Sequence, residues 1–420
     1  MTPPPSEQQV FDLADRALAL AGPSAQVTAW WELRLSTHPD PHATRTTGVE
    51  FVCVDRGVGR AFTTDVEDAG LEVAAGEARR RAAEGADEPG AVELPAPTSG
   101  RAHTGWEPAV LDLDLAAVAR DLGDRAAGVE LRWRAGAARS AIVSTAGVRS
   151  FEQRTHAAMT LSQESPGRQV VESAAAVGPG QLDLDDVVRR VRTLAPDKAP
   201  GAAPRGAVPV VLGPAAVAVV LDLVRPQFGR LAVRGASAVT ESLGSRMVAP
   251  CINLSDSPRF PGTLPRSYDA EGLPRQPLPL VQDGVAHRVV RDTASPGGPS
   301  TGHATVALRA APEPQHLVLV GGGASDEAEL MSTVARGVFI PALSPDGGRV
   351  LGAFAIENGS RGEPLADAPV EVDGLAVLAS AQALTMRQQL VPTGDPSART
   401  IAGSMCPALR ATSGVVFTDT

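Results

Sequence analysis

Aromatic residues and cysteines are scarce in this chain of 420 residues. Phe, Trp and Tyr together make up 3% of it, whereas 43% is hydrophobic, so the core has to be built mostly from Ala, Val and Leu. The three cysteines, Cys53, Cys251 and Cys406, are widely spaced and form no CxxC pair. A count this low and odd favours a reducing compartment over a disulfide framework.

The sequence also lacks a long apolar segment. Its first residues, MTPPPSEQQVFDLADRALALAG, have neither a basic stretch nor an uninterrupted apolar core, so we expect no signal peptide. The longest uncharged apolar run, Gly206 to Leu221, contains two prolines and is too short to span a bilayer. We therefore expect a cytoplasmic protein that does not contact membranes.

Excess positive charge is absent as well. A general nucleic-acid binder presents a basic face to the phosphates. The formal net charge of this chain is −10, which argues against that class of protein. We expect no nucleic-acid partner.

Histidines are not placed for a zinc peptidase site. Such a site needs two histidines about one helical turn apart and a glutamate after the first. None of the seven histidines is followed by Glu. His38 and His42 have i,i+4 spacing, but Pro39 and Pro41 between them argue against a helix there. The sequence therefore predicts no catalytic and no metal-ligating residue in this chain.

The length of the chain favours two or three domains. The clearest linker is the Pro-, Ala- and Gly-rich segment Ala195–Pro209. We place an N-terminal α/β domain with a mostly antiparallel sheet at residues 1–200 and a β-rich C-terminal domain at residues 206–420, which makes an α+β protein overall.

Hydrophobic periodicity predicts the elements of the first domain. Alternation from Val129 onward indicates antiparallel strands with one face exposed to water. Helices are expected at Ser6–Ala21, Asp65–Glu84, Asp112–Ala127 and Asp183–Leu194, and earlier strands at Ala25–Ser36, Gly48–Val54 and Gly59–Thr63.

The second domain is expected to open with a strand at Val208–Leu212. A helix should follow at Pro214–Val224, because proline is well suited to the first helical turn. A second helix is predicted at Asp326–Arg336, and the segment PVEVDGLAVLAS, Pro369–Ser380, reads as a strand.

Several motifs occur in order along the second domain. They are PVVLGP (209–214), YDAEGLP (268–274), STGHA (300–304), RGVFIPAL (336–343), GAFAIENG (352–359) and SMCPALRATSGVVF (404–417). Together they resemble the TldD/PmbA family, whose members are subunits of zinc metallopeptidases that work as two-subunit assemblies. Where the family's catalytic subunit carries HExxxH, this chain reads LDLVRPQF, Leu221–Phe228. The chain therefore resembles the subunit without zinc, the PmbA or TldE type.

The resemblance implies a function for the pair rather than for this chain alone. It implies a heterodimer with a TldD-type homologue that bears HExxxH and holds the zinc, and no cofactor in this chain. Substrates would be unfolded proteins or short peptides, bound as extended strands, and maturation of peptide natural products is one such activity. This chain would shape the substrate cavity.

Two segments of the second domain are candidates for the substrate groove or the subunit interface. In STGHA, Ser300, Thr301, Gly302 and His303 resemble a loop that shapes the groove. A polar loop whose hydroxyls cap nearby backbone groups accounts for the same residues, and a lone histidine favours that account.

In AIENG, Glu357 and Asn358 could lie at the mouth of the groove. Asn358-Gly359 is also a hairpin turn signal, and both interpretations can hold together.

Two other functions stay open on the sequence. One is a non-enzymatic regulatory or binding protein. The other is a stand-alone hydrolase with a different site, built on Cys251 or on a metal held by His303 with carboxylates. A cysteine nucleophile needs a neighbouring base, which the sequence does not show, so Cys251 and Cys406 are better explained as small buried hydrophobic residues.

Overall fold

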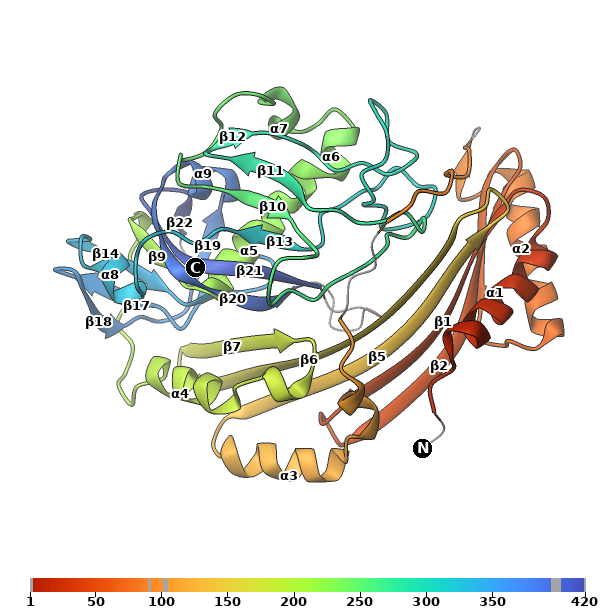
Figure 1. Ribbon diagram of the computed structural model, residues 1–420. Helices are drawn as coiled ribbons and strands as arrows, with labels where there is room; N and C mark the ends of the chain where they lie inside the picture. The colour runs from red at the N-terminus through yellow and green to blue at the C-terminus, as the bar shows by residue number, and fades with distance from the viewer. Residues whose placement is uncertain (1–2, 90–91, 101–104, 394–401, 419–420) are drawn as a thin grey trace.

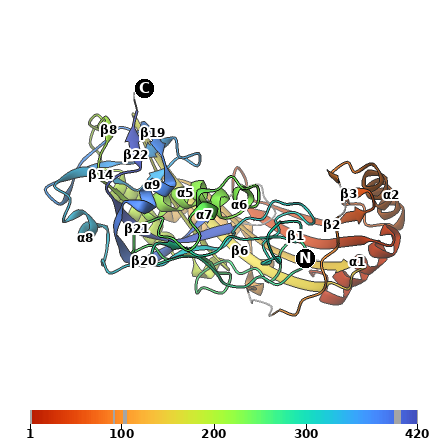
Figure 2. The ribbon, with the colours of Figure 1, turned by 90° about the horizontal axis from the view of Figure 1, so that it is seen from above.

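The computed structural model describes residues 3–89, 92–100, 105–393 and 402–418. Its largely antiparallel sheets and its helices confirm the predicted α+β class. Long, curved strands of one sheet sweep beneath the rest of the molecule in Figure 1, and the C-terminal half lies over part of their concave side. Seen from above, the molecule is elongated, with α2 near one end and α8 near the other (Figure 2).

The first sheet is antiparallel throughout, in the order β4-β3-β2-β1-β5-β6-β7. Its register pairs Ala25 with Cys53 on one side of β1 and Gln26 with Ser144 on the other. The strands are β1 Ala25–Ser36, β2 His42–Val54, β3 Gly57–Thr63, β4 Glu88–Pro89, β5 Glu130–Ser144, β6 Arg149–Ser165 and β7 Arg168–Ala176.

Both faces of this sheet are covered along much of its length. Odd-numbered residues of β1, such as Val27 and Leu33, belong to the apolar clusters under the helices. Even-numbered residues such as Gln26 and Glu32 are polar, yet they are 0% and 5% exposed. The expected water-exposed face is present at the start of β5, where Glu130 and Arg132 are exposed, but it does not extend to Gln26 and Glu32 of β1.

Helices cover the apolar face of the first sheet at its two ends. At one end lie α1, Glu7–Ala21, and α2, Asp68–Glu84, and toward the other lie α3, Leu115–Arg125, and α4, Leu184–Leu194 (Figure 1). Ser6 and Gln9 cap α1 reciprocally, and the i,i+4 spacing of Val10 and Ala14 turns both into the core.

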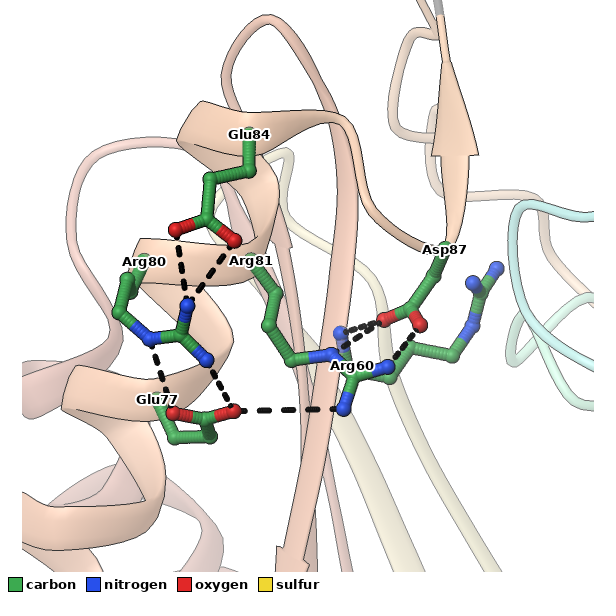
Figure 3. Close-up of polar contacts among 6 residues, drawn as sticks. All are labelled: Arg60, Glu77, Arg80, Arg81, Glu84 and Asp87. Atoms are coloured by element: carbon green, nitrogen blue, oxygen red, sulfur yellow. Dashed lines mark hydrogen bonds and ion pairs between the residues drawn. The ribbon is translucent and has the colours of Figure 1, made fainter.

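The contact between α2 and β3 is unusually close because β3 has a glycine there. A Cβ on Gly59 would lie 2.2 Å from the backbone of α2, so no other residue fits. Ion pairs line the exposed side and the end of this helix (Figure 3): Arg80 lies between Glu77, at 2.7 Å, and Glu84, at 2.8 Å, and Arg81 pairs with Asp87 beyond the helix end.

The second sheet has ten strands in the described part of the chain, in the order β12-β11-β10-β13-β21-β9-β14-β17-β18, with β20 paired to β21. Most pairs are antiparallel, but β13–β21 and β14–β9 are parallel. The strands are β9 Val210–Leu212, β10 Leu254–Asp256, β11 Leu278–Gln282, β12 Val285–Ala286, β13 Leu317–Leu319, β14 Arg336–Ile340, β17 Phe354–Glu357, β18 Ser360–Pro364, β20 Ala381–Thr393 and β21 Ala402–Ala411.

A smaller five-stranded sheet has the order β15-β16-β19-β22-β8. Its strands are β8 Gly206–Ala207, β15 Ala342–Leu343, β16 Arg349–Leu351, β19 Ala368–Val372 and β22 Val415–Phe417.

The helix α5, Pro214–Val224, forms as predicted, and Asp222 is its one charged residue. It packs on β20 and β21, and most of its residues are buried. The short helices around it are η3 Arg225–Phe228, α6 Arg230–Val233 and α7 Ala238–Glu241. Nowhere in the described ranges does a helix combine the length and the apolar character needed to cross a membrane.

Two predictions for the second half were wrong. The helix expected at Asp326–Arg336 is only the short α8, Glu327–Met331, because residues from Arg336 onward pair as β14 with β9 and β17. The strand expected over Pro369–Ser380 ends at Val372 and gives way to α9, Gly374–Ala379. Asp373 caps that helix at the Ala376 N–H, which favours the turn into it.

The two halves are tied together by Arg168, which is 5% exposed at the start of β7. Its guanidinium donates to the carbonyls of Leu194 and Gly352 and lies over the ring of Phe354, 4.5 Å from its centroid.

We expect Arg168→Met to lower the free energy of unfolding by about 3 kcal/mol, because buried carbonyls lose a charged donor. Urea unfolding measures this, and Arg189→Met, at an exposed arginine of α4, should change it by less than about 1 kcal/mol.

Candidate functional site

A cavity separates the polar face of the first sheet from the loops of the C-terminal half. Its volume is ≈ 380 Å³, and we call it the sheet–loop cavity. From the sheet it is lined by residues of β1, β2, β5 and β6, among them Trp30 and Arg154. From the loops it is lined by Arg266, Asp269 and Ala304, the last of which belongs to the STGHA motif.

Buried carboxylates organise these loops in place of regular strands. Asp269, from the YDAEGLP motif, is 1% exposed. One of its oxygens accepts the N–H groups of Glu271 and Leu273, each at 2.9 Å, and the other accepts the N–H of Ala304 at 3.0 Å. The motif therefore fixes its own turn and holds the STGHA loop at the same time.

Glu271 extends this arrangement to two further loops. Its side chain is fully buried and accepts the N–H of Leu308, and both the N–H and the hydroxyl of Thr293. Burial, with the nearby Asp269 adding to it, raises the pKa of Glu271 to about 7.

Two more aspartates repeat the pattern. Asp256, at the end of β10, accepts the N–H groups of Gln315 and His316, and Asp292 accepts the N–H of Ala311 at 2.9 Å. Because buried N–H groups without an acceptor are costly, these carboxylates substitute for a strand ladder in the segment 254–316.

The loops are joined to the first sheet by a buried ion cluster. Glu152 of β6 is 6% exposed and contacts Arg154 at 2.7 Å and Arg266 at 2.8 Å. Burial opposes its ionisation, but Arg266 and Arg154 outweigh burial and hold the pKa of Glu152 at about 2. A hydrogen bond between uncharged groups also joins the loops to the first sheet: Gln26 Nε2 donates to the carbonyl of Ala270.

The hydroxyls of the STGHA motif bond to the backbone, as the capping interpretation requires. Thr301 Oγ1 accepts the N–H of Arg291 at 2.8 Å, and Ser300 Oγ accepts the N–H of Gly302 at 3.2 Å. Gly302 has φ +75°, and a Cβ there would lie 2.5 Å from the carbonyl oxygen of Pro274. These bonds are compatible with a role in the groove, which stays a prediction.

His303 does not line the sheet–loop cavity, and its side chain is fully buried. Its Nδ1 donates to the carbonyl of Thr301 at 2.8 Å, and its Nε2 faces Asp256 Oδ1 at 3.6 Å. His316 Nδ1 approaches the same oxygen at 3.6 Å. Burial opposes ionisation of Asp256, but the two imidazoles outweigh burial and hold its pKa well below the usual range.

Glu357 and Asn358 lie elsewhere, at the hairpin between β17 and β18. Asn358 has φ +50° and Gly359 has φ +79°, as in the predicted tight turn. Both Glu357 and Asn358 are exposed. Neither lines the sheet–loop cavity, so the structure does not bring them together with the STGHA loop.

An ion pair lies at the end of α5, in the segment Leu221–Phe228. Asp222 and Arg225 are in contact, and Arg225 Nη2 also donates to Thr393 Oγ1 of β20 at 3.3 Å. Cys406 of β21 belongs to the same neighbourhood. Burial, with Asp222 adding to it, raises the pKa of the Cys406 thiol well above its usual range.

These residues do not fit a zinc ion. The guanidinium of Arg225 already contacts the carboxylate of Asp222, and the buried thiol of Cys406 resists becoming the thiolate that binds metals. Residues 3–89, 92–100, 105–393 and 402–418 contain no group of three or more His, Cys, Asp or Glu side chains arranged to hold a metal ion. The three cysteines are free thiols.

Sequence reasoning missed the carboxylates and arginines that build the sheet–loop cavity. YDAEGLP contributed to the family resemblance, but nothing in it indicated that Asp269 and Glu271 accept backbone N–H groups from three loops. Glu152 and Arg154 lie in a polar stretch of β6, with Gln153 between them and Thr155 after them, which is typical of a strand exposed to water. Only their distant partner, Arg266, reveals that this face is buried.

Residues 205–413 match the family described as the PmbA/TldA metallopeptidase C-terminal domain. No curated protein matches the chain.

Several solved structures share the fold over nearly the whole chain. TldE from Thermococcus kodakarensis is 18% identical, with a TM-score of 0.75 over 97% of this chain and 99% of that one. A putative modulator of a DNA gyrase from Thermotoga maritima gives the same identity, coverage and TM-score. A putative modulator of DNA gyrase from Bacteroides thetaiotaomicron is 14% identical, with a TM-score of 0.75 over 99% of this chain and 100% of that one. At these identities the likeness shows a common fold.

The ion cluster at Glu152 predicts an acid-sensitive contribution to stability. Its pKa lies below the usual 4.5, so the stabilisation is complete above about pH 4.5 and is lost as the pH falls toward 2. We expect Glu152→Gln to lower the free energy of unfolding by about 3 kcal/mol at pH 7. Urea unfolding at several pH values measures this. The difference in the free energy of unfolding between the wild type and Glu152→Gln should decrease as the pH falls.

The control for this experiment is Glu130→Gln, at an exposed pair with Arg132. That variant should stay within about 1 kcal/mol of the wild type at every pH. If Glu152→Gln lowers the free energy of unfolding equally at pH 7 and pH 3, the stabilisation does not come from the ionised carboxylate of Glu152.

The burial of the thiols predicts low reactivity. Burial raises the pKa of Cys53 to about 11, and it raises the pKa values of Cys251 and Cys406 as well. We expect Ellman's reagent at pH 8 to modify the half-buried Cys251 first, and Cys53 and Cys406 only after unfolding in guanidinium. Rapid modification that disappears in Cys406→Ser would mean that Cys406 is a reactive thiolate.

Proposed function

Since the chain belongs to the PmbA/TldD family through residues 205–413, we propose that it is the non-catalytic subunit of a two-subunit zinc metallopeptidase. Its partner would be a homologue that carries HExxxH and holds the zinc. The substrates would be unfolded proteins or short peptides. TldE from Thermococcus kodakarensis shares the fold, which is consistent with this assignment.

The observation that carries the proposal is the ion pair at the end of α5. In the resembling catalytic subunits this segment supplies metal ligands. Here Arg225 places a fixed positive charge against Asp222, beside the buried Cys406. A cationic side chain at this position repels a metal ion, so hydrolysis by the pair has to rely on the partner.

In this proposal the chain contributes a rigid wall. The segment 254–316 is fixed by buried carboxylates and by the cluster of Glu152, Arg154 and Arg266, so the sheet–loop cavity keeps its shape without a bound ligand. The residues proposed to shape the groove or the subunit interface are Ser300, Thr301, Gly302, His303, Glu357 and Asn358. An extended peptide would add to a strand edge by main-chain hydrogen bonds.

The zinc of the partner would polarise the scissile carbonyl and activate a water molecule. The residues of this chain would exclude folded proteins from the site and orient the peptide. They would not take part in proton transfer at the metal.

The proposal predicts that the metal is present only in the pair. The chain is purified alone and after co-expression with an HExxxH-bearing homologue from the same genome, and zinc is measured by plasma mass spectrometry. We expect stoichiometric zinc and chelator-sensitive hydrolysis of labelled casein from the pair, and neither from the chain alone. Cys406→Ser in this chain should leave both unchanged, whereas alanine at the first histidine of the partner's motif should abolish both.

Other outcomes favour the other functions. Chelator-sensitive hydrolysis by the chain alone would identify a stand-alone hydrolase. A chain that forms no complex with the homologue and hydrolyses nothing would fit a regulatory or binding protein.

A further inference from the structure

A second cavity lies where α4 and β7 meet the second sheet. Its volume is ≈ 470 Å³, and we call it the α4–α8 cavity. Leu194, Met331, Phe339 and Pro341 give it apolar walls, and the charged side chains among its lining residues come from both halves of the chain. It shares no lining residue with the sheet–loop cavity.

Glu172 of β7 is the most deeply buried carboxylate in this lining, at 8% exposed. Arg190 Nη1 approaches it at 3.5 Å, which is an ionic contact but too long for a good hydrogen bond. Arg190 is also engaged elsewhere, with Gln389 of β20 and with Asp186, 3.4 Å away. Within the described ranges, no hydrogen bond to the Glu172 carboxylate is formed.

Charged groups of both signs surround Glu172. Glu327 of α8 lines the same cavity and has no hydrogen-bonded side-chain partner in the described part of the chain. Glu327 and Asp186 both act on Glu172 as like charges, against the single arginine Arg190. A carboxylate buried this deeply is either protonated or balanced by a cation.

The remaining arginines of the lining are engaged with other groups. Arg189 pairs with Asp186 and is largely exposed. Arg361 lies over the ring of Phe354, 4.9 Å from its centroid. The contact with Phe354 leaves the N–H donors of the exposed Arg361 available to water or an anion, whereas a cationic ligand would meet carboxylates with unused acceptor capacity.

We infer that the α4–α8 cavity binds an organic cation, a guanidinium or ammonium group on an apolar chain, such as an arginine or lysine side chain of a peptide. The charged end would lie between Glu172 and Glu327, and the methylenes would pack on Met331 and Phe339. Arginine and lysine combine these two parts, a cationic head and an apolar stem. The inference rests on this cavity and not on the proposed peptidase partnership.

The affinity for such a cation should depend on pH. The pKa of Glu172 is raised to about 7: burial is the main cause, Arg190 opposes it, and the like charges of Glu327 and Asp186 add to it. The carboxyl is therefore largely neutral at pH 6 and ionised at pH 8. Arg189, Asp326, Arg361 and Gln389 also line the cavity, and the arginines keep their charge over this range.

The test uses the full chain alone, with two probes, agmatine and the peptide acetyl-Ala-Arg-Ala-amide, followed by isothermal titration calorimetry. We expect both to bind, with affinity rising up to about tenfold from pH 6 to pH 8. Glu172→Gln should weaken binding about tenfold or more and remove the pH dependence, and Glu327→Gln should weaken it about threefold or more. Glu371→Gln, an exposed glutamate of β19, is the matched control and should bind like the wild type.

Several outcomes would overturn the inference. They are no binding of either probe by the wild type, unchanged affinity in both glutamine variants, or equal binding of the peptide with norleucine in place of arginine. Binding of agmatine without the peptide would assign the cavity to free amines or guanidines instead of peptide side chains. Should Glu172→Gln fail to fold, as judged by circular dichroism, Glu327→Gln alone decides, because Glu327 is only partly buried.

Discussion

Acceptance of backbone N–H groups by buried carboxylates is the interaction on which the rest of this structure depends. The segment 254–316 contains only three short strands, yet much of it is buried. Its N–H groups would be costly without acceptors, and Asp256, Asp269, Glu271 and Asp292 supply them. A carboxylate accepts several bonds at once, so a single residue such as Asp269 fixes its own turn and a loop thirty-five residues away in sequence.

The loops held by these carboxylates also determine how the two halves meet. The polar face of the first sheet is covered by loops, so the contact cannot be an ordinary apolar one. Glu152 is enclosed by Arg154 and Arg266, and Arg168 binds carbonyls of both halves. Such charges are tolerated only when every partner is in place, which makes the contact specific and sensitive to single substitutions.

Much of the fold was predictable, because local signals and tertiary packing agree there. The range of β1 was predicted correctly from its length and composition, and α5 from the proline at its first turn and the proline beyond its end. At Arg336 the local signals and the tertiary packing disagree, because the pairing of β14 with β9 and β17 overrides a helical sequence pattern. The candidate site was less predictable from the sequence. Arg225 lies three residues from Asp222, but Thr393 and Cys406 join it from positions far along the chain, and no local pattern encodes that meeting.

The carboxylates of this chain differ in how completely its own arginines pair with them. Asp222 has its own cation in Arg225, and Glu152 has two, so each is complete without a ligand. Glu172 is as buried as Glu152, yet its one arginine is shared with Asp186 and Gln389 and approaches no closer than 3.5 Å. Since burial penalises both carboxylates, the difference in their pKa values, about 2 and about 7, follows from their partners. Completed pairs hold the fold together, and an incomplete one beside a cavity leaves binding capacity for a group from outside.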